Sequence, residues 1–283
     1  MATLLKGKPV VEAMAEDMAG RIAKLAEAGV TPTLALVRLG ARPDDLSYER
    51  TAVKRAASLG IATKPYVLDE FAPEEALRAT LQSINYDRTV HGCLMFRPLP
   101  SFINEKAMCN TLIADKDVDG ISLASLASVF TDSNEGFPPC TAEACVKMLE
   151  FYEVPVVGKH VVIVGRSLVV GKPVSMMLLR RNASVTICHS RTENLEEICR
   201  SADIVICATG RARAFGREFF SPGQTVLDVG INFDTQGKLC GDVDFEEVEP
   251  VVGSITPVPG GIGTVTTSLT MEHVLRAAEA ATS

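Results

Sequence analysis

The sequence contains no tryptophan, and aromatic residues make up only 5% of it. Lys and Arg never form runs longer than two residues, and the net charge is −7. Proteins that bind nucleic acids carry basic clusters, which this chain lacks. We therefore expect no nucleic-acid partner, and we expect any anionic ligand to be held by a few local groups.

Long apolar runs are also missing. No stretch reaches the ~18 apolar residues that a membrane-spanning helix needs. Charged residues such as Lys6, Lys8 and Glu12 interrupt the first segment, so it does not resemble a secretory signal. We expect a cytoplasmic protein with no membrane partner.

The eight cysteines include no C-x-x-C pair, and the four histidines form no set with ligand spacing. Several cysteines lie in apolar runs such as "VTICHS" and "DIVICATG". This pattern predicts buried, reduced thiols, with neither disulfides nor a structural metal.

The length of 283 residues is sufficient for two domains, and 47% apolar with 22% charged residues is ordinary globular composition. A change in composition over 131–140 predicts the domain boundary there. We expect a first domain over 1–138 and a second over 139–264. A final helix over 265–283 is expected to return to the first domain.

Hydrophobic patterning predicts an α/β fold in both domains. In the first, the strand candidates "TPTLALVRLG", "ATKPYVLDE" and "VHGCLMF" alternate with helical stretches, which is typical of a parallel sheet. In the second, "KHVVIVGRSLVVGKPVSMMLLRRNASVTICHSR" reads as strand, glycine turn, helix and strand. That order is typical of a Rossmann-like dinucleotide-binding unit.

The turn of this unit is G-x-S-x-x-x-G, with Gly165, Ser167 and Gly171, and it feeds a helix N-terminus suited to a pyrophosphate. An NAD site would place Asp or Glu at the end of the second strand. Here Ser190 and Arg191 follow that strand, and Arg166 lies in the turn. These donors suit a 2′-phosphate, so we expect NADP, with NAD less favoured.

Three further loops, at 208–210, 228–232 and 256–263, follow strand candidates and should line the same edge of the sheet. Thr209 and Ile231 are therefore candidate cofactor contacts. Gly260 and Gly261 would let the backbone approach a flat ring closely.

The segment "DKDVDG" carries Asp117 and Asp119. Solvated loop charges are the default interpretation of such a pair. A metal pair is poorly supported, because no further ligands share the spacing. A carboxylate that binds the amino-pyrimidine ring of a pterin is the remaining alternative.

Several motifs together resemble the methylenetetrahydrofolate dehydrogenase/cyclohydrolase family: "KDVDGI", "FPPCTAEACVKMLE", "VVIVGRSLVVGKPVSMMLL", "VLDVGIN", "CGDV" and "ITPVPGGIGTVT". The resemblance implies a two-domain α/β homodimer that binds tetrahydrofolate derivatives and NADP. It implies oxidation of 5,10-methylenetetrahydrofolate to the methenyl form, which many members then hydrolyse to the 10-formyl form.

The resemblance also implies roles for single residues. Tyr48 and Asp119 would be catalytic and would contact the folate, Asp119 through its pterin. Further substrate contacts would come from Pro98, Gly260 and Gly261. Arg166, Ser167 and Ser190 would hold the cofactor phosphates. Together with Gly165, Arg191, Thr209 and Ile231, which the strand-end pattern indicates, they are the candidate cofactor contacts.

Two of the chain's departures from this family concern the hydrolysis step. The family pattern has Lys four residues after the tyrosine, where this chain has Ala52, and "VQLPLP" is replaced by "MFRPLP", which puts Phe96 at the glutamine position. Lys54 follows Tyr48 by six residues, which places it about 120° around a regular helix.

These departures should affect the two reactions differently. Hydride transfer mainly needs alignment of two rings, whereas hydrolysis needs a side chain that moves protons. We therefore predict a dehydrogenase whose cyclohydrolase activity is absent or weak. The alternatives are a fully bifunctional enzyme in which another residue such as Lys54 takes over, a catalytically silent regulator that binds folate or nucleotide, and another small NADP oxidoreductase of the shikimate type.

Overall fold

The computed structural model describes residues 1–133 and 135–282. The chain divides into two compact units, Met1–Glu12 with Thr141–Thr266 and Ala13–Cys140 with Thr267–Ser283. We call them the six-stranded unit and the three-stranded unit after their main sheets. Each is described separately.

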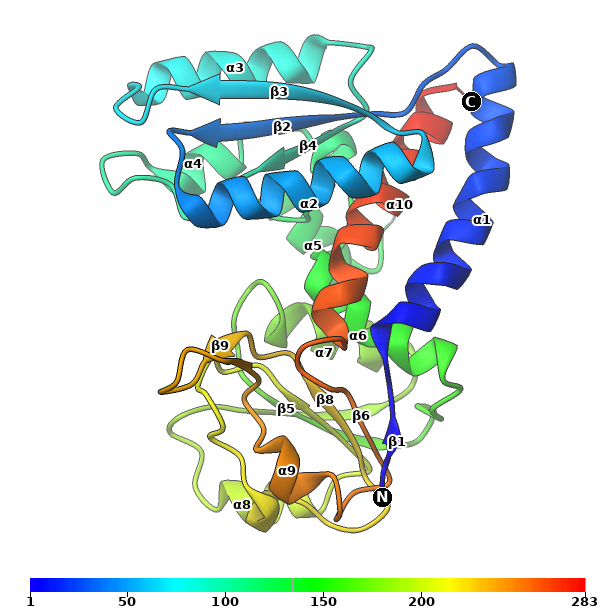
Figure 1. The fold of residues 1–283 in the computed structure, drawn as a ribbon, viewed down its shortest axis with the longest axis vertical. Helices are drawn as coiled ribbons and strands as arrows, with labels where there is room; N and C mark the ends of the chain where they lie inside the picture. The colour runs from blue at the N-terminus through cyan, green and yellow to red at the C-terminus, as the bar shows by residue number, and fades with distance from the viewer. Residues whose placement is uncertain (134, 283) are drawn as a thin grey trace. The chain divides into compact units, whose positions relative to one another are not determined.

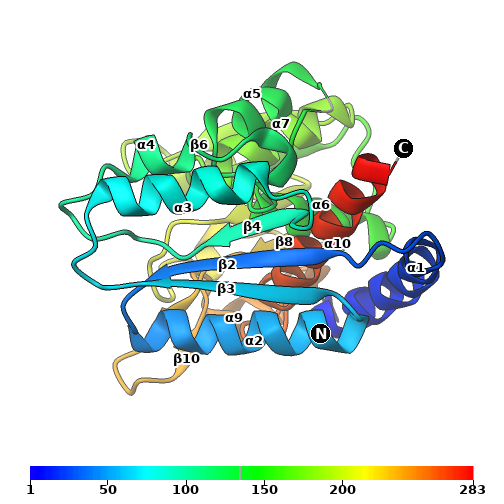
Figure 2. The same ribbon diagram turned by 90° about the horizontal axis from the view of Figure 1, so that it is seen from above.

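The three-stranded unit contains a parallel sheet of order β3-β2-β4, as the alternating pattern predicted. Helices α2 and α3 cover its opposite faces (Figures 1 and 2). On one side, the buried Leu77, Leu81 and Ile84 of α3 pack against β2 and β4. The elements that lie wholly or mostly in this unit are α1 (Gly7–Glu27), β2 (Thr33–Leu39), α2 (Pro43–Leu59), β3 (Ala62–Leu68), α3 (Glu74–Tyr86), β4 (Gly92–Met95), α4 (Glu105–Cys109), a 3-10 helix (Ala114–Lys116), α5 (Leu123–Thr131) and α10 (Ile262–Thr282).

The C-terminal helix α10 returns to this unit, which confirms the prediction for the end of the chain. Arg21 of α1 donates to both carboxylate oxygens of Glu279 in α10, at 2.8 and 2.7 Å. The buried Val274 of α10 also lies close to Gly92, the first residue of β4.

The six-stranded unit has a sheet of order β1-β11-β8-β7-β5-β6, and every strand pair in it is parallel. Helix α7 lies on one face of the sheet, and α8 and α9 lie on the other (Figure 1). The elements are β1 (Thr3–Leu4), α6 (Cys140–Phe151), β5 (His160–Val164), α7 (Gly171–Arg180), β6 (Ser184–Cys188), α8 (Leu195–Arg200), β7 (Ile204–Cys207), a 3-10 helix (Arg217–Phe219), β8 (Thr225–Asp228), β9 (Asn232–Phe233), β10 (Leu239–Cys240), α9 (Phe245–Val248) and β11 (Ser254–Ile255).

The first twelve residues lie in a different unit from the one that the sequence predicted for them. The sequence-based boundary assigned residues 1–12 to the first domain, but they belong to the six-stranded unit. The physical reason is that β1 pairs in parallel with β11, so that Thr3 lies opposite Ser254 and Leu4 opposite Ile255. A two-residue strand carries too little periodicity to reveal this pairing in the sequence.

All eight cysteines are buried and free, as the sequence predicted. Within residues 1–133 and 135–282, no helix is long and apolar enough to cross a membrane. The same residues contain no group of three or more His, Cys, Asp or Glu side chains placed to hold a metal ion.

Candidate functional site

Helix α2 carries Tyr48 and has clear limits at both ends. Pro43 opens it with the acidic Asp44 and Asp45 in the first turn, which suits the positive end of a helix dipole. At the other end, Gly60 adopts φ 78° and its N–H bonds back to the last turn. Residues 43–59 are helical throughout, so the spacing along α2 follows ordinary helix geometry.

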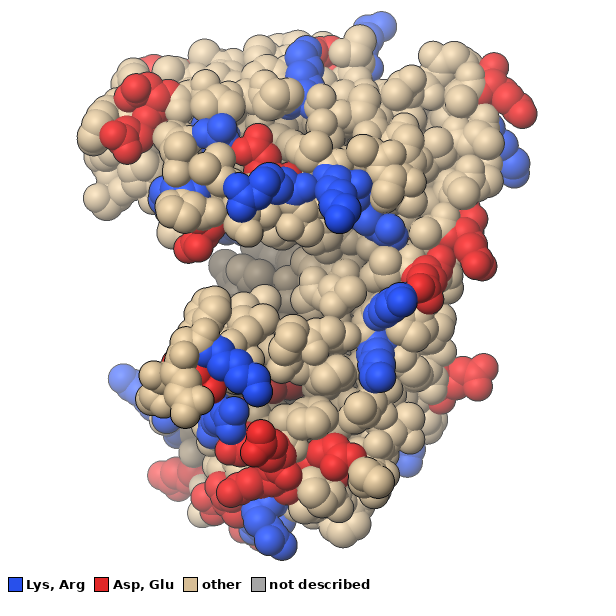
Figure 3. All heavy atoms as spheres, in the orientation of Figure 1, with Lys and Arg blue, Asp and Glu red and all other residues tan. Residues whose placement is uncertain are grey.

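This geometry separates Ala52 from Lys54. Ala52 is fully buried, whereas Lys54 is exposed. On the molecular surface, Lys and Arg side chains gather over α2 (Figure 3). The ammonium group of Lys54 therefore faces solvent, while a methyl group occupies the buried position four residues after Tyr48.

The ring of Tyr48 packs edge-on against Phe96, with the ring centroids 5.9 Å apart. The Tyr48 hydroxyl is hydrogen-bonded to Thr267 and Thr270 of α10, and burial raises the pKa of Tyr48 well above its usual range. Tyr48 therefore keeps its proton near neutral pH and can act as a hydrogen-bonding group, but not as a base. The two threonines were missed in the sequence, because they lie more than 200 residues away from Tyr48.

The loop after α4 uses its two aspartates in different ways. Asp117 is fully buried and accepts hydrogen bonds from Ile121 N, Ser122 N and Ser125 Oγ at 3.1, 2.7 and 2.7 Å. It holds the start of α5 and is not a solvated loop charge. The default interpretation of the sequence was therefore wrong for Asp117.

Asp119 has fewer partners than Asp117. Its side chain retains 23% exposure, and its Oδ2 lies 3.5 Å from Nη2 of Arg97. Burial raises the pKa of this carboxyl to about 6, and the charge of Arg97 opposes the rise. Across residues 1–133 and 135–282, the Asp119 carboxylate accepts no other hydrogen bond, so acceptor positions remain available to a ligand.

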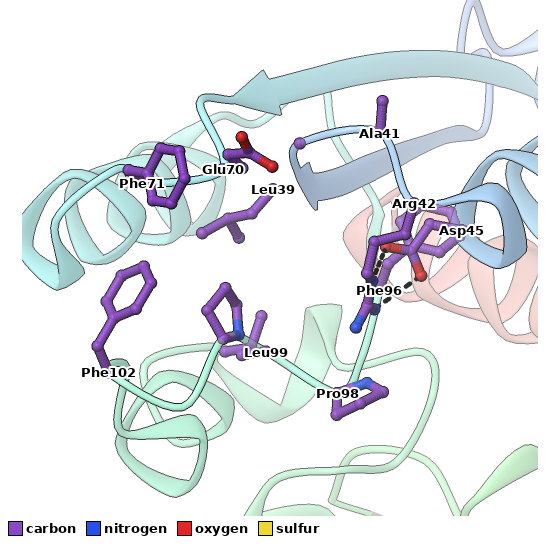
Figure 4. Close-up of a pocket in the computed structure, with 12 residues that line it drawn as sticks. Leu39, Ala41, Arg42, Asp45, Glu70, Phe71, Phe96, Pro98, Leu99 and Phe102 are labelled. Atoms are coloured by element: carbon purple, nitrogen blue, oxygen red, sulfur yellow. Dashed lines mark hydrogen bonds and ion pairs between the residues drawn. The ribbon is translucent and has the colours of Figure 1, made fainter.

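A cavity of about 480 Å³ lies where β2, β3 and β4 end (Figure 4). Phe96, Pro98, Leu99 and Phe102 form much of one wall, and Arg42 is joined to Asp45 by two hydrogen bonds of 2.8 and 2.9 Å. The carboxyl ends of parallel strands are the usual place for ligands in such sheets. Pro98 lines this cavity, and its role as a substrate contact stays a prediction.

In the six-stranded unit, the turn between β5 and α7 depends on two glycines. Gly165 has φ 136° and lies so close to Ala208 that a Cβ would overlap its carbonyl oxygen. A Cβ on Gly171 would overlap the carbonyl oxygen of Gly165. Ser167 Oγ accepts a hydrogen bond of 3.1 Å from Val170 N inside the turn. The chain therefore approaches the start of α7 closely, as the turn of a dinucleotide-binding unit does. Val170 N and Lys172 N already donate to Ser167, and Pro173 has no N–H, so these positions are not open to an anion.

Two arginines next to this turn, Arg166 and Arg191, have guanidinium groups without partners in the described residues. Arg166, Ser190 and Arg191 are all exposed. In the part of the chain that the structure describes, the guanidinium groups of Arg166 and Arg191 form no ion pair or hydrogen bond. Two unpaired guanidinium groups with a nearby hydroxyl fit a phosphate group.

Two buried aspartates organise the neighbouring loops. Asp242 is fully buried and accepts hydrogen bonds from five donors, which are Thr209 N, Thr209 Oγ1, Gly210 N, Arg211 N and Asn232 Nδ2. Asp228, at the end of β8, accepts from the N–H groups of Gly230, Asp242 and Val243. Burial raises the pKa of Asp228 to about 7 against the effect of these three hydrogen bonds.

These two aspartates were missed as site residues. The sequence signal was present, because Asp228 directly follows the strand residues Val226 and Leu227 in "VLDVGIN" and Asp242 lies in "CGDV". The structure also assigns the Thr209 hydroxyl proton to Asp242. Any contact between Thr209 and a cofactor would therefore use the remaining lone pairs of that hydroxyl.

The Gly/Pro loop lines a cavity of about 240 Å³ together with the loop after β8. Gly260 is exposed and has φ 102°, and Ile231 is 67% exposed beside it in this lining. Gly261 is buried, and a Cβ there would lie 2.6 Å from the Pro257 carbonyl oxygen. This cavity brings together Ile231, Gly260 and Gly261, which the sequence had selected from two separate loops.

Two family models match the chain. Residues 5–119 match the catalytic domain of tetrahydrofolate dehydrogenase/cyclohydrolase, and residues 139–282 match its NAD(P)-binding domain. Among curated proteins, the bifunctional protein FolD of Carboxydothermus hydrogenoformans is 47% identical over 281 residues, which is 99% of this chain and 98% of that protein. The protein of the same name from Clostridium botulinum is 46% identical and covers 99% of both chains.

Solved structures agree with these matches. The bifunctional enzyme FolD of Campylobacter jejuni superimposes with a TM-score of 0.96 at 35% identity, covering 99% of each chain. The Trypanosoma brucei dehydrogenase-cyclohydrolase, solved with NADP and an inhibitor, gives a TM-score of 0.93 at 30% identity, covering 99% of this chain and 98% of that one.

Proposed function

Because the chain belongs to the tetrahydrofolate dehydrogenase/cyclohydrolase family, we propose that it oxidises 5,10-methylenetetrahydrofolate to the 5,10-methenyl form with NADP. Bound NADP supplies the hydride acceptor. The observation that carries this proposal is the Asp119 carboxylate, which has acceptor positions to spare in a partly buried loop. A pterin amino-pyrimidine presents adjacent N–H donors, which a carboxylate can accept as a pair.

The choice of NADP over NAD is supported by the unpaired guanidinium groups of Arg166 and Arg191 near the glycine turn. No acidic side chain follows β6 directly, where an NAD site would hold the ribose hydroxyls. Within this proposal, Gly165, Ser167 and Ser190 hold the phosphates, and Thr209 and Ile231 contact the cofactor further along. Pro98, Gly260 and Gly261 contact the folate.

We further propose that hydrolysis of the methenyl product is weak or absent. Tyr48 is flanked by Ala52 and Phe96, neither of which can carry a proton, and burial keeps the Tyr48 hydroxyl protonated. Lys54 is exposed and lies on another part of the helix circumference. Water addition to the methenyl carbon requires proton transfers for which this arrangement offers no base.

A fully bifunctional enzyme is the second candidate, and the comparisons favour it over the dehydrogenase-only alternative. The relatives that are 44 to 47% identical over nearly the whole chain are named bifunctional. If the second candidate is correct, a group other than a side chain at position 52 or 96 must move the protons.

Two assays on the purified protein test the proposal. NADPH formation at 340 nm that depends on methylenetetrahydrofolate tests the dehydrogenase, and its absence would favour the silent regulator. Decay of methenyltetrahydrofolate, corrected for the spontaneous rate, tests hydrolysis. Accelerated decay would decide for the bifunctional candidate. If a Tyr48→Phe variant then no longer accelerated the decay, the hydrolytic activity would depend on Tyr48 of α2.

A homodimer is also proposed, on the resemblance to the family alone. Light scattering after size-exclusion chromatography would test the dimer. A mass near the 30.3 kDa of one chain would contradict it.

A further inference from the structure

Arg97 occupies the position after Phe96, where the family pattern "VQLPLP" has leucine and this chain has "MFRPLP". Its guanidinium lies between two carboxylates. One Nη is 3.5 Å from Asp119 Oδ2, and the other is 3.7 Å from Glu105 Oε1. The side chain is 25% exposed, so solvent screens these contacts only in part.

The contact with Asp119 differs from the other arginine pairs of the same unit. Arg38 meets Glu49 at 2.7 Å, and Arg42 meets Asp45 through two bonds of 2.8 and 2.9 Å. Charge-assisted hydrogen bonds are usually about 2.7 to 2.9 Å long. At 3.5 Å, Arg97 stabilises the negative charge of Asp119 but leaves the carboxylate lone pairs largely available.

We propose that Arg97 is a positioning residue that keeps Asp119 ionised, so that this carboxylate can accept two adjacent N–H donors from the amino-pyrimidine ring of the substrate. The inference rests on the proposed function and deepens it, since it explains how a partly buried carboxylate remains an acceptor. Leucine at this position would leave the same carboxylate without a counter-charge.

The surroundings of Asp119 otherwise oppose its ionisation. The pKa of Asp119 is raised to about 6, mainly by burial, and the nearby charge of Asp117 acts in the same direction. Arg97 is the strongest opposing influence, and His273 contributes less. The other titratable groups that interact with Asp119 are Tyr48, Cys109 and Cys140, which are neutral near pH 7 because burial raises their pKa values.

Binding of tetrahydrofolate, measured by calorimetry between pH 5 and 8.5 under argon, tests the role of Arg97. Arg97→Leu introduces the family residue and should move the acidic midpoint of binding upward by about one pH unit or more. If the midpoint rises by one unit from about pH 6, binding weakens about fivefold at pH 6 and is unchanged at pH 8.5. Arg97→Lys should restore most of the wild-type profile.

Two further variants isolate the mechanism. In an Asp119→Asn background, Arg97→Leu should no longer change the pH profile, because the titrating group is gone. Lys106→Leu, which removes an exposed cation from α4, is the matched control and should match wild type. Thermal unfolding monitors folding, and Arg97→Gln replaces Arg97→Leu if the leucine variant does not fold.

Two results would overturn the inference. An unchanged profile in Arg97→Leu would mean that Asp119 does not depend on Arg97. An equal loss of affinity at every pH, retained in the Asp119→Asn background, would mean that Arg97 contacts the substrate directly. Failure of the wild type both to bind tetrahydrofolate and to form NADPH would instead contradict the proposed function as well, which distinguishes the two failures.

Discussion

Buried carboxylates at loops have different roles in the two units. In the six-stranded unit, Asp242 is fully buried and five donors converge on it. In the three-stranded unit, Asp119 retains 23% exposure and has one long contact to Arg97. The number of internal donors therefore determines whether a carboxylate builds a loop or can bind a ligand.

The same contrast occurs within one loop. The Asp117 carboxylate accepts three hydrogen bonds from its own loop and from the start of α5. The Asp119 carboxylate, two residues further along, has one long contact and keeps acceptor positions open. A carboxylate with all its acceptors filled cannot recognise a substrate without breaking the structure that fills them. The predictions below test this division of roles, beginning with the largest expected effect.

Asp242→Asn should produce the largest loss of stability. The variant removes the charge and turns one acceptor into a donor that faces other donors, which should cost about 3 to 5 kcal/mol of unfolding free energy. Urea unfolding followed by circular dichroism measures this. Asp244→Asn is the control, because the carboxylate of Asp244 is more exposed and lies 3.9 Å from Arg213. A loss below about 1 kcal/mol in Asp242→Asn would contradict the loop-building role.

Asp119→Asn should leave stability nearly unchanged and impair substrate binding. The loss of charge-assisted hydrogen bonds to the pterin should raise KM for methylenetetrahydrofolate about 10- to 100-fold. The affinity for NADP should not change. Steady-state kinetics tests this beside Asp115→Asn, an exposed carboxylate of the same segment. Equal kinetics in the two variants would show that Asp119 is not the pterin contact.

Arg166→Ala should weaken NADP binding about tenfold and leave NAD binding unchanged, because only the 2′-phosphate is lost as a partner. Fluorescence titration with both reduced cofactors measures the difference. Lys238→Ala removes an exposed cation from another loop of the same unit and serves as the control. An equal loss of affinity for both cofactors would show that Arg166 does not bind the 2′-phosphate.

Acid should weaken substrate binding in the wild type. Burial raises the pKa of Asp119 to about 6, and only the ionised carboxylate accepts both donors. Binding is therefore complete well above pH 6 and is lost as pH falls through this value, with KM about tenfold higher at pH 5. A KM that stays constant from pH 5 to pH 8 would mean that Asp119 is either not titrating or not in contact with the substrate.

Lys54→Ala should have the smallest effect, with both reactions within about twofold of wild type, because Lys54 is exposed. The methenyl decay assay is the relevant measurement. If the wild type accelerates this decay and Lys54→Ala abolishes the acceleration, the lysine has taken over proton transfer and α2 must distort when substrate binds.

The sequence predicted the parallel strands of both units, the glycine turn before α7 and the return of the C-terminal helix. These features depend on residues near one another in the chain, because hydrophobic period and glycine spacing are local properties. The sequence also selected Ile231, Gly260 and Gly261, which the structure brings to one cavity. It missed Asp228 and Asp242 as organisers of loops, since their donors come from other segments.

By itself, the sequence determined that the dinucleotide turn carries basic residues, and its resemblance to the family predicts that Ala52 and Phe96 occupy the positions of the family's lysine and glutamine. Only the tertiary structure decided that Lys54 faces solvent, that the Asp117 carboxylate is bonded within the loop and that the Asp119 carboxylate keeps open acceptor positions beside Arg97. The physical reason is that the protonation and availability of a carboxylate depend on burial and on partners that folding brings from distant parts of the chain.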